Sequence, residues 1–260
     1  MVLIPWVNLS LLSSAWVYAY ILPNDGPVQK AIVSITHESS AEPSCLRLNP
    51  EVENGTLIDQ LWRNNCDLVE QFLGNAFSVA QAEQTSTGTF TSFHYYSVQD
   101  YYYLLETVLH KPYLTETNPP MSEPSLRSSI PAVIDSTNKS FQDAENFRRS
   151  LINDLEISED IIKNGTFHAA GLGYVKWLQE NINLGWFAYQ VSRIPCIYGW
   201  AELAKSLNNR QDVDHSSIFY QEWIVNNLDW NYGASHSQKL QKAVDRYNNS
   251  ETFEVYNRLF

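Results

Sequence analysis

The sequence has few charged residues and no concentrated positive charge. Only 18% of its 260 residues are charged, and 17 Lys and Arg stand against 29 Asp and Glu, which gives a net charge of −12. No run of Lys or Arg interrupts this balance, so we expect the protein to repel nucleic acid. Long apolar runs are also missing. The stretch at residues 15–22 is short and follows several polar residues, which argues against a membrane span.

Cysteine is scarce, and no arrangement of cysteine and histidine suggests zinc. The three cysteines, Cys45, Cys66 and Cys196, cannot all pair with one another, and no C-x-x-C motif occurs. We therefore expect a reducing compartment and a cytoplasmic location. The alternative is a weak targeting segment within the uncharged residues 1–24, although their first part lacks the basic residues of a secretory signal.

Motifs for metals and phosphate-bearing cofactors are missing too. Glu106 and His110 form one E-x-x-x-H pair, but a di-iron bundle needs matching ligands from other helices. A glycine-rich phosphate loop is also absent. We expect neither a metal nor a cofactor.

Aromatic residues are plentiful. The chain holds 15 Tyr, 8 Trp and 11 Phe, and 44% of its residues are hydrophobic. This composition predicts a large interior lined in part by hydroxyl groups, which favours a flat small-molecule ligand.

Apolar spacing predicts an all-α body over residues 55–260, preceded by an irregular extension over residues 1–54. One strand-like run lies in the extension, at residues 31–36. Prolines between residues 112 and 131 predict a linker after the second helix, with at most a short helix near Leu126. The expected helices cover residues 56–74, 91–110, 168–182, 186–207, 215–228 and 237–247, with further helical patterns from residues 140 and 158.

The densest polar cluster is YYSVQDYYYL, at residues 95–104. Helical spacing brings Tyr96, Gln99, Asp100 and Tyr103 within about one turn of each other. A carboxylate among phenols can bind an amidine-like heterocycle through paired hydrogen bonds. The alternative is a solvated Asp100 beside tyrosines that belong to the core.

The second cluster is RIPCIYGW, at residues 193–200. Pro195 lies inside an apolar helix and should kink it, which opens space beside a neighbouring side chain. Cys196 could then act as a nucleophile, while the alternative is a small inert core residue.

These motifs occur together in one order along the chain: LIDQLWRNNCDLVEQFLGNAF, YYSVQDYYYL, Tyr174 in GYVKWL, Pro195-Cys196, and YQEWI followed by Asp229-Trp230. In that order they resemble the TenA (thiaminase II) family over residues 55–235. The resemblance implies a heme-oxygenase-like helical bundle, a fold shared with pyrroloquinoline quinone synthase.

The resemblance also implies a reaction, namely hydrolysis at the exocyclic methylene of a 4-aminopyrimidine. Thiamin would lose its thiazole, and a degraded thiamin would lose ammonia. By the same resemblance Asp100 holds the aminopyrimidine edge, Tyr103 and Tyr174 orient the ring, and Cys196 adds to the ring. Substrate contacts are also expected from Gln99, Tyr96, Trp200 and Asn227.

Three positions depart from the family pattern. Trp200 and Asn227 stand where a Tyr is usual, and the family's catalytic Glu lies on a final helix beyond Phe260. We therefore expect a bundle without that helix, which would expose an apolar stripe for a homo-oligomer to cover. Glu254 could replace the Glu, but the residues that follow it do not fit.

Three functional hypotheses remain open. The first is a hydrolase of thiamin-derived aminopyrimidines, the second is a binding or accessory protein without turnover, and the third is an enzyme repurposed for another small apolar metabolite.

Overall fold

A computed structural model describes residues 45, 47–48, 52–83, 90–116, 123–228 and 250–260. Four features named above lie outside these residues: the uncharged N-terminal segment, the strand-like run 31–36, the pair Asp229-Trp230 and the helix expected at 237–247. The division into an extension over residues 1–54 and a body over residues 55–260 stays a prediction.

Every element in the described part of the chain is helical, which confirms the all-α prediction. The elements are α3 (Leu57–Asn64), α4 (Cys66–Leu73), α5 (Ala76–Glu83), α6 (Phe90–Glu116), α7 (Glu123–Asn153), α8 (Glu159–Asn164), α9 (Ala169–Ile182), α10 (Trp186–Ser192), the π-helix η1 (Pro195–Gly199), α11 (Trp200–Asn208), the π-helix η2 (Tyr220–Ile224), α12 (Val225–Leu228) and α14 (Ser250–Leu259).

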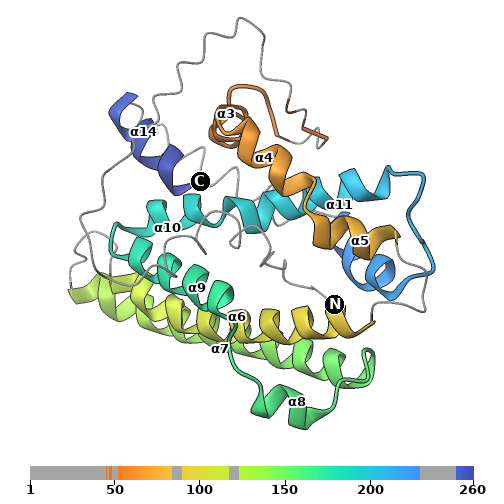
Figure 1. Cartoon of the computed structure of the whole chain (residues 1–260). Helices are drawn as coiled ribbons and strands as arrows, with labels where there is room; N and C mark the ends of the chain where they lie inside the picture. Colours follow the sequence, from red (N-terminus) through yellow and green to blue (C-terminus); the bar gives the residue numbers. More distant parts are fainter. Residues whose placement is uncertain (1–44, 46, 49–51, 84–89, 117–122, 229–249) are drawn as a thin grey trace, which may run out of the picture.

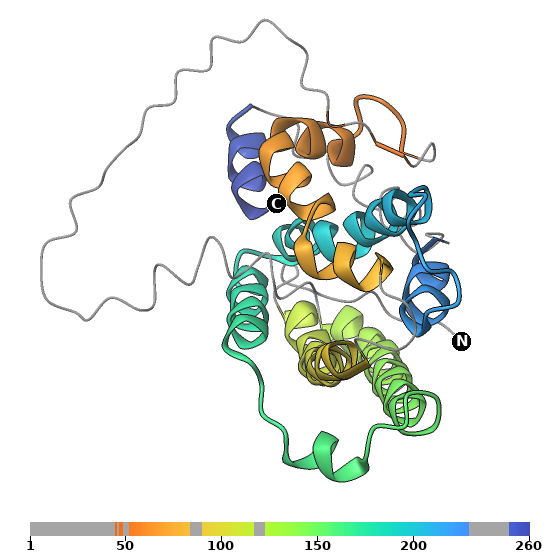
Figure 2. The same cartoon turned by 45° about the vertical axis from the view of Figure 1, so that its right-hand side comes forward.

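The long helices α6 and α7 lie side by side, and α9 packs on both α6 and α10 (Figure 1). The run α10–η1–α11 crosses the middle of the molecule, between the α6–α7 pair and the helices α3, α4 and α5 (Figures 1 and 2). α4 contacts α11, and α14 contacts α10. The core along this run is aromatic, and its most deeply buried rings include Trp62, Trp200, Trp223, Tyr189 and Tyr198.

The helix predicted at residues 56–74 is present but broken in the middle. It begins as expected, because the Thr56 hydroxyl accepts a hydrogen bond from the backbone N–H of Asp59, and Gly74 ends it. The break lies at Asn65, whose backbone leaves the helical range. Its amide donates to Leu61 O and to Asn257 Oδ1, both at 2.8 Å, so a contact from the far end of the chain accompanies the break.

The predicted linker is helical at both of its ends, and its residues 117–122 lie outside the described part of the chain. α6 continues past His110 and through Pro112 to Glu116, and α7 contains Pro131. Both prolines are exposed, so their rings face away from the neighbouring helix. The mutual packing of two long helices therefore outweighs the backbone hydrogen bond that each proline removes.

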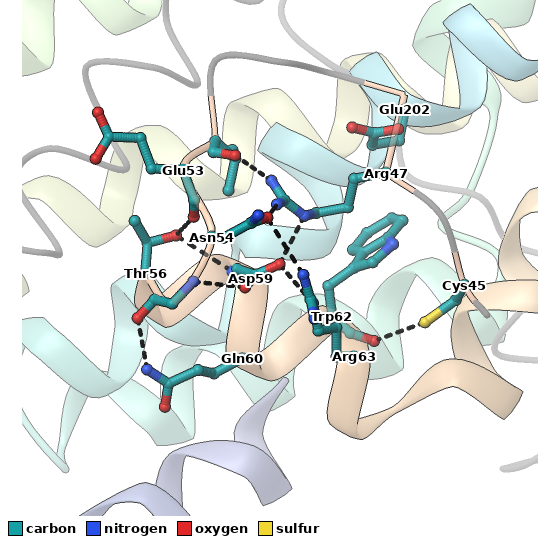
Figure 3. A network of polar contacts seen from close by, with 12 residues as sticks. Cys45, Arg47, Glu53, Asn54, Thr56, Asp59, Gln60, Trp62, Arg63 and Glu202 are labelled. Carbon is teal, nitrogen blue, oxygen red and sulfur yellow. Dashed lines mark hydrogen bonds and ion pairs between the residues drawn. The ribbon is translucent and has the colours of Figure 1, made fainter. Parts of the chain in front are cut away.

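The end of the predicted extension packs on the body through a strap, which we define as the described residues from Cys45 to Asn54 (Figure 3). A disulfide joins Cys45 to Cys66 at the start of α4. Arg47 Nε lies 2.8 Å from Asp59 Oδ1, and the Leu48 N–H donates to Glu202 Oε2 at 2.6 Å. The expectation of reduced cysteines is therefore wrong for this pair, since chain folding brings together two cysteines that spacing alone did not couple.

Within the described residues, no helix combines the length and apolar character that crossing a membrane requires.

Candidate functional site

The predicted cluster on α6 is buried. Tyr96, Gln99, Asp100 and Tyr103 are each no more than 5% exposed, so they point into the bundle rather than to solvent. The alternative of a solvated Asp100 is therefore wrong. Burial raises the pKa of Tyr96, Tyr103 and Cys196, and the charge of Asp100 adds to the increase in each case.

Cys196, in η1, is in contact with Tyr174, in α9. The Tyr174 hydroxyl lies 2.7 Å from Cys196 Sγ and 3.4 Å from the carbonyl oxygen of Ser192, and both side chains are buried. The Tyr174 ring lies 5.9 Å from the Tyr103 ring, centroid to centroid. The fold thus brings Tyr103, Tyr174 and Cys196 together from three different elements. Asp100 is buried on α6, one helical turn before Tyr103.

A π-helix presents the cysteine. The predicted disturbance at Pro195 is a π-helix, in which Pro195 occupies the first turn and the N–H of Cys196 donates to Arg193 O at 3.0 Å. One π turn inside an otherwise α-helical run often marks a functional position, because it rotates side chains out of the regular register. The YQEWI motif forms the second π-helix, η2.

The thiol is protonated in this environment. Burial raises the pKa of Cys196 to about 12, and the charge of Asp100 adds to the increase. The hydrogen bond between Cys196 and Tyr174 and the charge of Arg193 act in the opposite direction. Burial likewise raises the pKa of Tyr103 and Tyr174. Cys196 therefore needs help to become a thiolate, the nucleophilic form of a cysteine.

Three further predicted residues are engaged with the protein itself. The Gln99 amide donates to Thr166 O at 3.1 Å and accepts from the His168 N–H at 2.6 Å, so it fixes the loop before α9. The Asn227 amide donates to Trp223 O at 2.8 Å. Trp200 packs against Phe72 and Trp223, with centroids at 5.4 and 5.2 Å. Their roles in substrate binding stay predictions.

A second group of polar side chains, which the sequence patterns did not indicate, lies along α10 and α6. The Arg193 guanidinium lies over the Tyr189 ring, 5.4 Å from its centroid, and the Tyr189 hydroxyl lies 3.1 Å from His110 Nδ1. Burial, Arg193 and Lys176 lower the pKa of His110 to about 4, so the imidazole is neutral near pH 7. Arg193 stands in the RIPC motif, three residues before the cysteine, and that spacing was the signal that could have pointed to it.

No group of three or more His, Cys, Asp or Glu side chains in the described ranges is placed to hold a metal ion. A surface groove of about 270 Å³ lies between the end of α6 and α9, beside Tyr113, Lys176 and Asn183. It contains none of the predicted site residues.

Solved structures of TenA homologues share the fold of this chain. The chain aligns with a TenA homologue from P. horikoshii OT3 at a TM-score of 0.61 and 17% identity, over 79% of this chain and 91% of that one. A protein of Sulfolobus solfataricus P2 described as TenA-like and a thiaminase aligns at 0.55 and 16%, over 80% and 91%. A TenA family protein from Silicibacter sp. TM1040, described as a transcription regulator, aligns at 0.56 and 18%, over 79% and 92%.

No protein-family model and no curated protein matches the sequence. The resemblance that the motifs indicate is confirmed in structure: this chain has the heme-oxygenase-like helical fold of TenA homologues.

Proposed function

We propose that this chain, built on the TenA fold, is a TenA-type hydrolase that acts on thiamin or on 4-aminopyrimidines derived from it. One observation carries the proposal: the fold packs a buried thiol (Cys196) and two buried phenols (Tyr174 and Tyr103) together, with a buried carboxylate (Asp100) one helical turn from Tyr103. This combination suits a flat, amidine-like heterocycle that is attacked by sulfur.

In the proposed reaction, Asp100 accepts hydrogen bonds from the amino edge of the pyrimidine, and the two phenols orient the ring. The thiolate of Cys196 forms a carbon–sulfur bond with a ring carbon. The electron pair released into the ring expels the leaving group from the exocyclic methylene, as thiazole or, after protonation, as ammonia. Water then bonds to the methylene carbon and loses a proton. Finally, the carbon–sulfur bond breaks, which restores the ring and the thiolate.

The test is hydrolysis of thiamin and of 4-amino-5-aminomethyl-2-methylpyrimidine by the purified chain. Cys196→Ser should lower kcat by about 100-fold or more, because serine is a far weaker nucleophile in this setting. Asp100→Asn should chiefly weaken binding of the pyrimidine. Asp67→Asn, an exposed carboxylate on α4, is the matched control and should keep full activity. Full activity of Cys196→Ser would refute the assignment of the nucleophile.

Two observations favour a second candidate, a protein that binds an aminopyrimidine without turning it over. The pKa of Cys196 is raised to about 12, and the Asn227 amide, which stands where the family pattern has a Tyr, donates to its own helix. Binding without turnover in the same assay would support this candidate. No binding to folded protein would instead favour the third hypothesis, an enzyme for another apolar metabolite, with Trp200 shaping its pocket.

Glu254 offers no direct replacement for the family's glutamate, since it is exposed on α14. The expectation about the glutamate helix stays a prediction.

A further inference from the structure

Glu202, on α11, is a fully buried carboxylate that the proposed reaction does not use. Its Oε1 atom accepts a hydrogen bond from the Tyr198 hydroxyl, and its Oε2 atom accepts one from the Leu48 N–H at 2.6 Å. A buried carboxylate depends on such donors, because no water replaces a donor that leaves. Glu202 therefore joins the strap to η1, although Leu48 and Glu202 are 154 residues apart in sequence.

Tyr198 belongs to the same π-helix as Cys196 and follows it by two residues. Both side chains are buried, and the Tyr198 ring packs edge-on against Trp62 of α3, with the centroids 5.1 Å apart. Because η1 is only five residues long, a movement of Tyr198 also moves the backbone that carries Cys196. The hydrogen bond from Tyr198 to Glu202 thus restrains the turn of the cysteine.

Two attachments hold the strap where its Leu48 N–H reaches Glu202. The disulfide joins Cys45 to Cys66, and Arg47 forms an ion pair of 2.8 Å with the buried Asp59 (Figure 3). Cys66 is partly exposed, so a reductant can reach the disulfide. Without the disulfide the strap keeps the ion pair but loses its covalent attachment, and its contacts then open more often.

We propose that the Cys45–Cys66 disulfide is a redox-sensitive restraint on the turn that carries Cys196, and that Glu202 and Tyr198 transmit it. Reduction by a dithiol breaks the S–S bond, leaves both cysteines as thiols and oxidises the dithiol to a disulfide. The strap then releases Glu202 more often, and η1 opens and exposes Cys196. The catalytic meaning of this restraint rests on the proposed function, but exposure of Cys196 is measured without any substrate.

The test measures how fast iodoacetamide alkylates Cys196 at pH 8 under native conditions, and mass spectrometry identifies the labelled residue. The disulfide-bonded parent is compared with Cys45→Ser/Cys66→Ser, in which Cys196 is the only cysteine. Tyr198→Phe is then made in both backgrounds. It removes the hydrogen bond to Glu202 and keeps the aromatic ring.

Tyr101→Phe is the matched control in both backgrounds. It also removes a hydrogen bond from a buried tyrosine to a glutamate, because the Tyr101 hydroxyl donates to Glu145 Oε1 at 3.0 Å. This bond joins α6 to α7 and has no contact with the strap or η1. Urea denaturation of every variant gives the alkylation rate that global unfolding alone would produce, and this rate is subtracted.

The double cysteine variant should be alkylated about fivefold faster than the parent, which is the effect expected for the loss of one hydrogen bond. Tyr198→Phe should have a similar effect in the parent but less than about a twofold effect in the double variant, because the two changes break the same link. Tyr101→Phe should leave the rate of Cys196 alkylation unchanged in both backgrounds.

An equal effect of Tyr198→Phe in the two backgrounds would overturn the proposal, since the disulfide and the phenol would then act independently. So would a double variant that reacts at the parent rate, or rates that global unfolding explains in full. If aminopyrimidine turnover is absent but the rates follow the predicted order, the proposed function fails while the restraint stands. Turnover with equal rates would show the reverse.

Discussion

Gly199 shows at the scale of one residue how closely the π-helix is packed. A Cβ atom added there would lie 3.0 Å from Cε1 and 3.1 Å from Cζ of Phe72, which itself packs on Trp200. Gly199 therefore lets α4 approach the turn that carries Cys196. Gly173, on the exposed side of α9, has no atom within 4 Å of the same added position.

We expect Gly199→Ala to lower the free energy of unfolding by about 1–3 kcal/mol, because the Phe72 ring has to move within a packed core. Gly173→Ala is the matched control and should raise it by about 0.5–1 kcal/mol through helix propensity. Urea denaturation of both variants measures the difference. If the Gly199→Ala protein is as stable as its parent, the Phe72 ring does not pack against position 199 as closely as the structure indicates.

His110 predicts a pH dependence of stability. Its pKa is lowered to about 4 in the folded protein, against 6.5 in an unfolded chain. Between pH 6.5 and 4 the unfolded chain therefore binds a proton that the folded protein does not, and the free energy of unfolding falls as the pH falls, by about 3 kcal/mol over the whole window.

The measurement is the denaturant midpoint at several pH values for the parent and for His110→Gln, which retains a polar group for Tyr189. The difference between the two proteins isolates the contribution of His110 from other titrating groups. Identical slopes against pH would contradict a buried, neutral histidine.

At the scale of elements, the strap couples the N-terminal side of the chain to the π-helix. Glu202 on α11 accepts from the Leu48 N–H and from the Tyr198 hydroxyl, and Tyr198 lies in η1 and packs against Trp62 at 5.1 Å. The Cys45–Cys66 disulfide closes a loop with a sequence separation of 21 and joins the strap to the start of α4. The ion pair between Arg47 and Asp59 joins the strap to α3 (Figure 3). Reduction should loosen this end of the core.

Reduction by dithiothreitol should lower the free energy of unfolding by about 2–4 kcal/mol, because an open chain has more unfolded conformations. The double variant Cys45→Ser/Cys66→Ser should show the lower stability from the start and no response to dithiothreitol. A thiol assay of the denatured, unreduced protein should find one free thiol. Three free thiols would instead support the reducing, cytoplasmic setting that we expected from the sequence.

The elements that the sequence predicted well are those fixed by local chemistry. Thr56 and Gly74 bound the first helical region, and the helical spacing of residues 96 to 103 correctly placed Asp100 and Tyr103 on one buried face. The prolines led to a wrong prediction at both ends of the linker, because the free-energy cost of a proline in a helix depends on how the whole helix packs. The disulfide, the break at Asn65 and the contact between His110 and Tyr189 depend on segments that are distant in sequence, and local patterns do not encode such contacts.

At the scale of the whole molecule, the outer side of the α6–α7 pair carries exposed apolar residues. Ile130, Ile134 and Phe141 follow helical spacing along α7, and each is more than 40% exposed. We propose that a second copy of the chain covers this stripe, which keeps the expectation of a homo-oligomer but places the surface on α7.

Sedimentation should then show a particle larger than the 29.8 kDa monomer. Ile134→Glu should shift it to the monomer, because a buried interface disfavours an unpaired carboxylate. Ile161→Glu on α8, where the side chain is 59% exposed, is the control and should leave the assembly intact. A parent protein that sediments as a monomer at all concentrations would contradict this surface.

The proposed function requires that the buried residues around Asp100 and Cys196 bind an aminopyrimidine. Calorimetric titration with 4-amino-5-hydroxymethyl-2-methylpyrimidine, the product of the proposed hydrolysis, should show one site per chain. Binding should be lost in Asp100→Asn and kept in Asp67→Asn. If folded protein releases or absorbs no heat of binding, or if Asp100→Asn binds as tightly as the parent, the site does not recognise an aminopyrimidine and the proposed function is wrong.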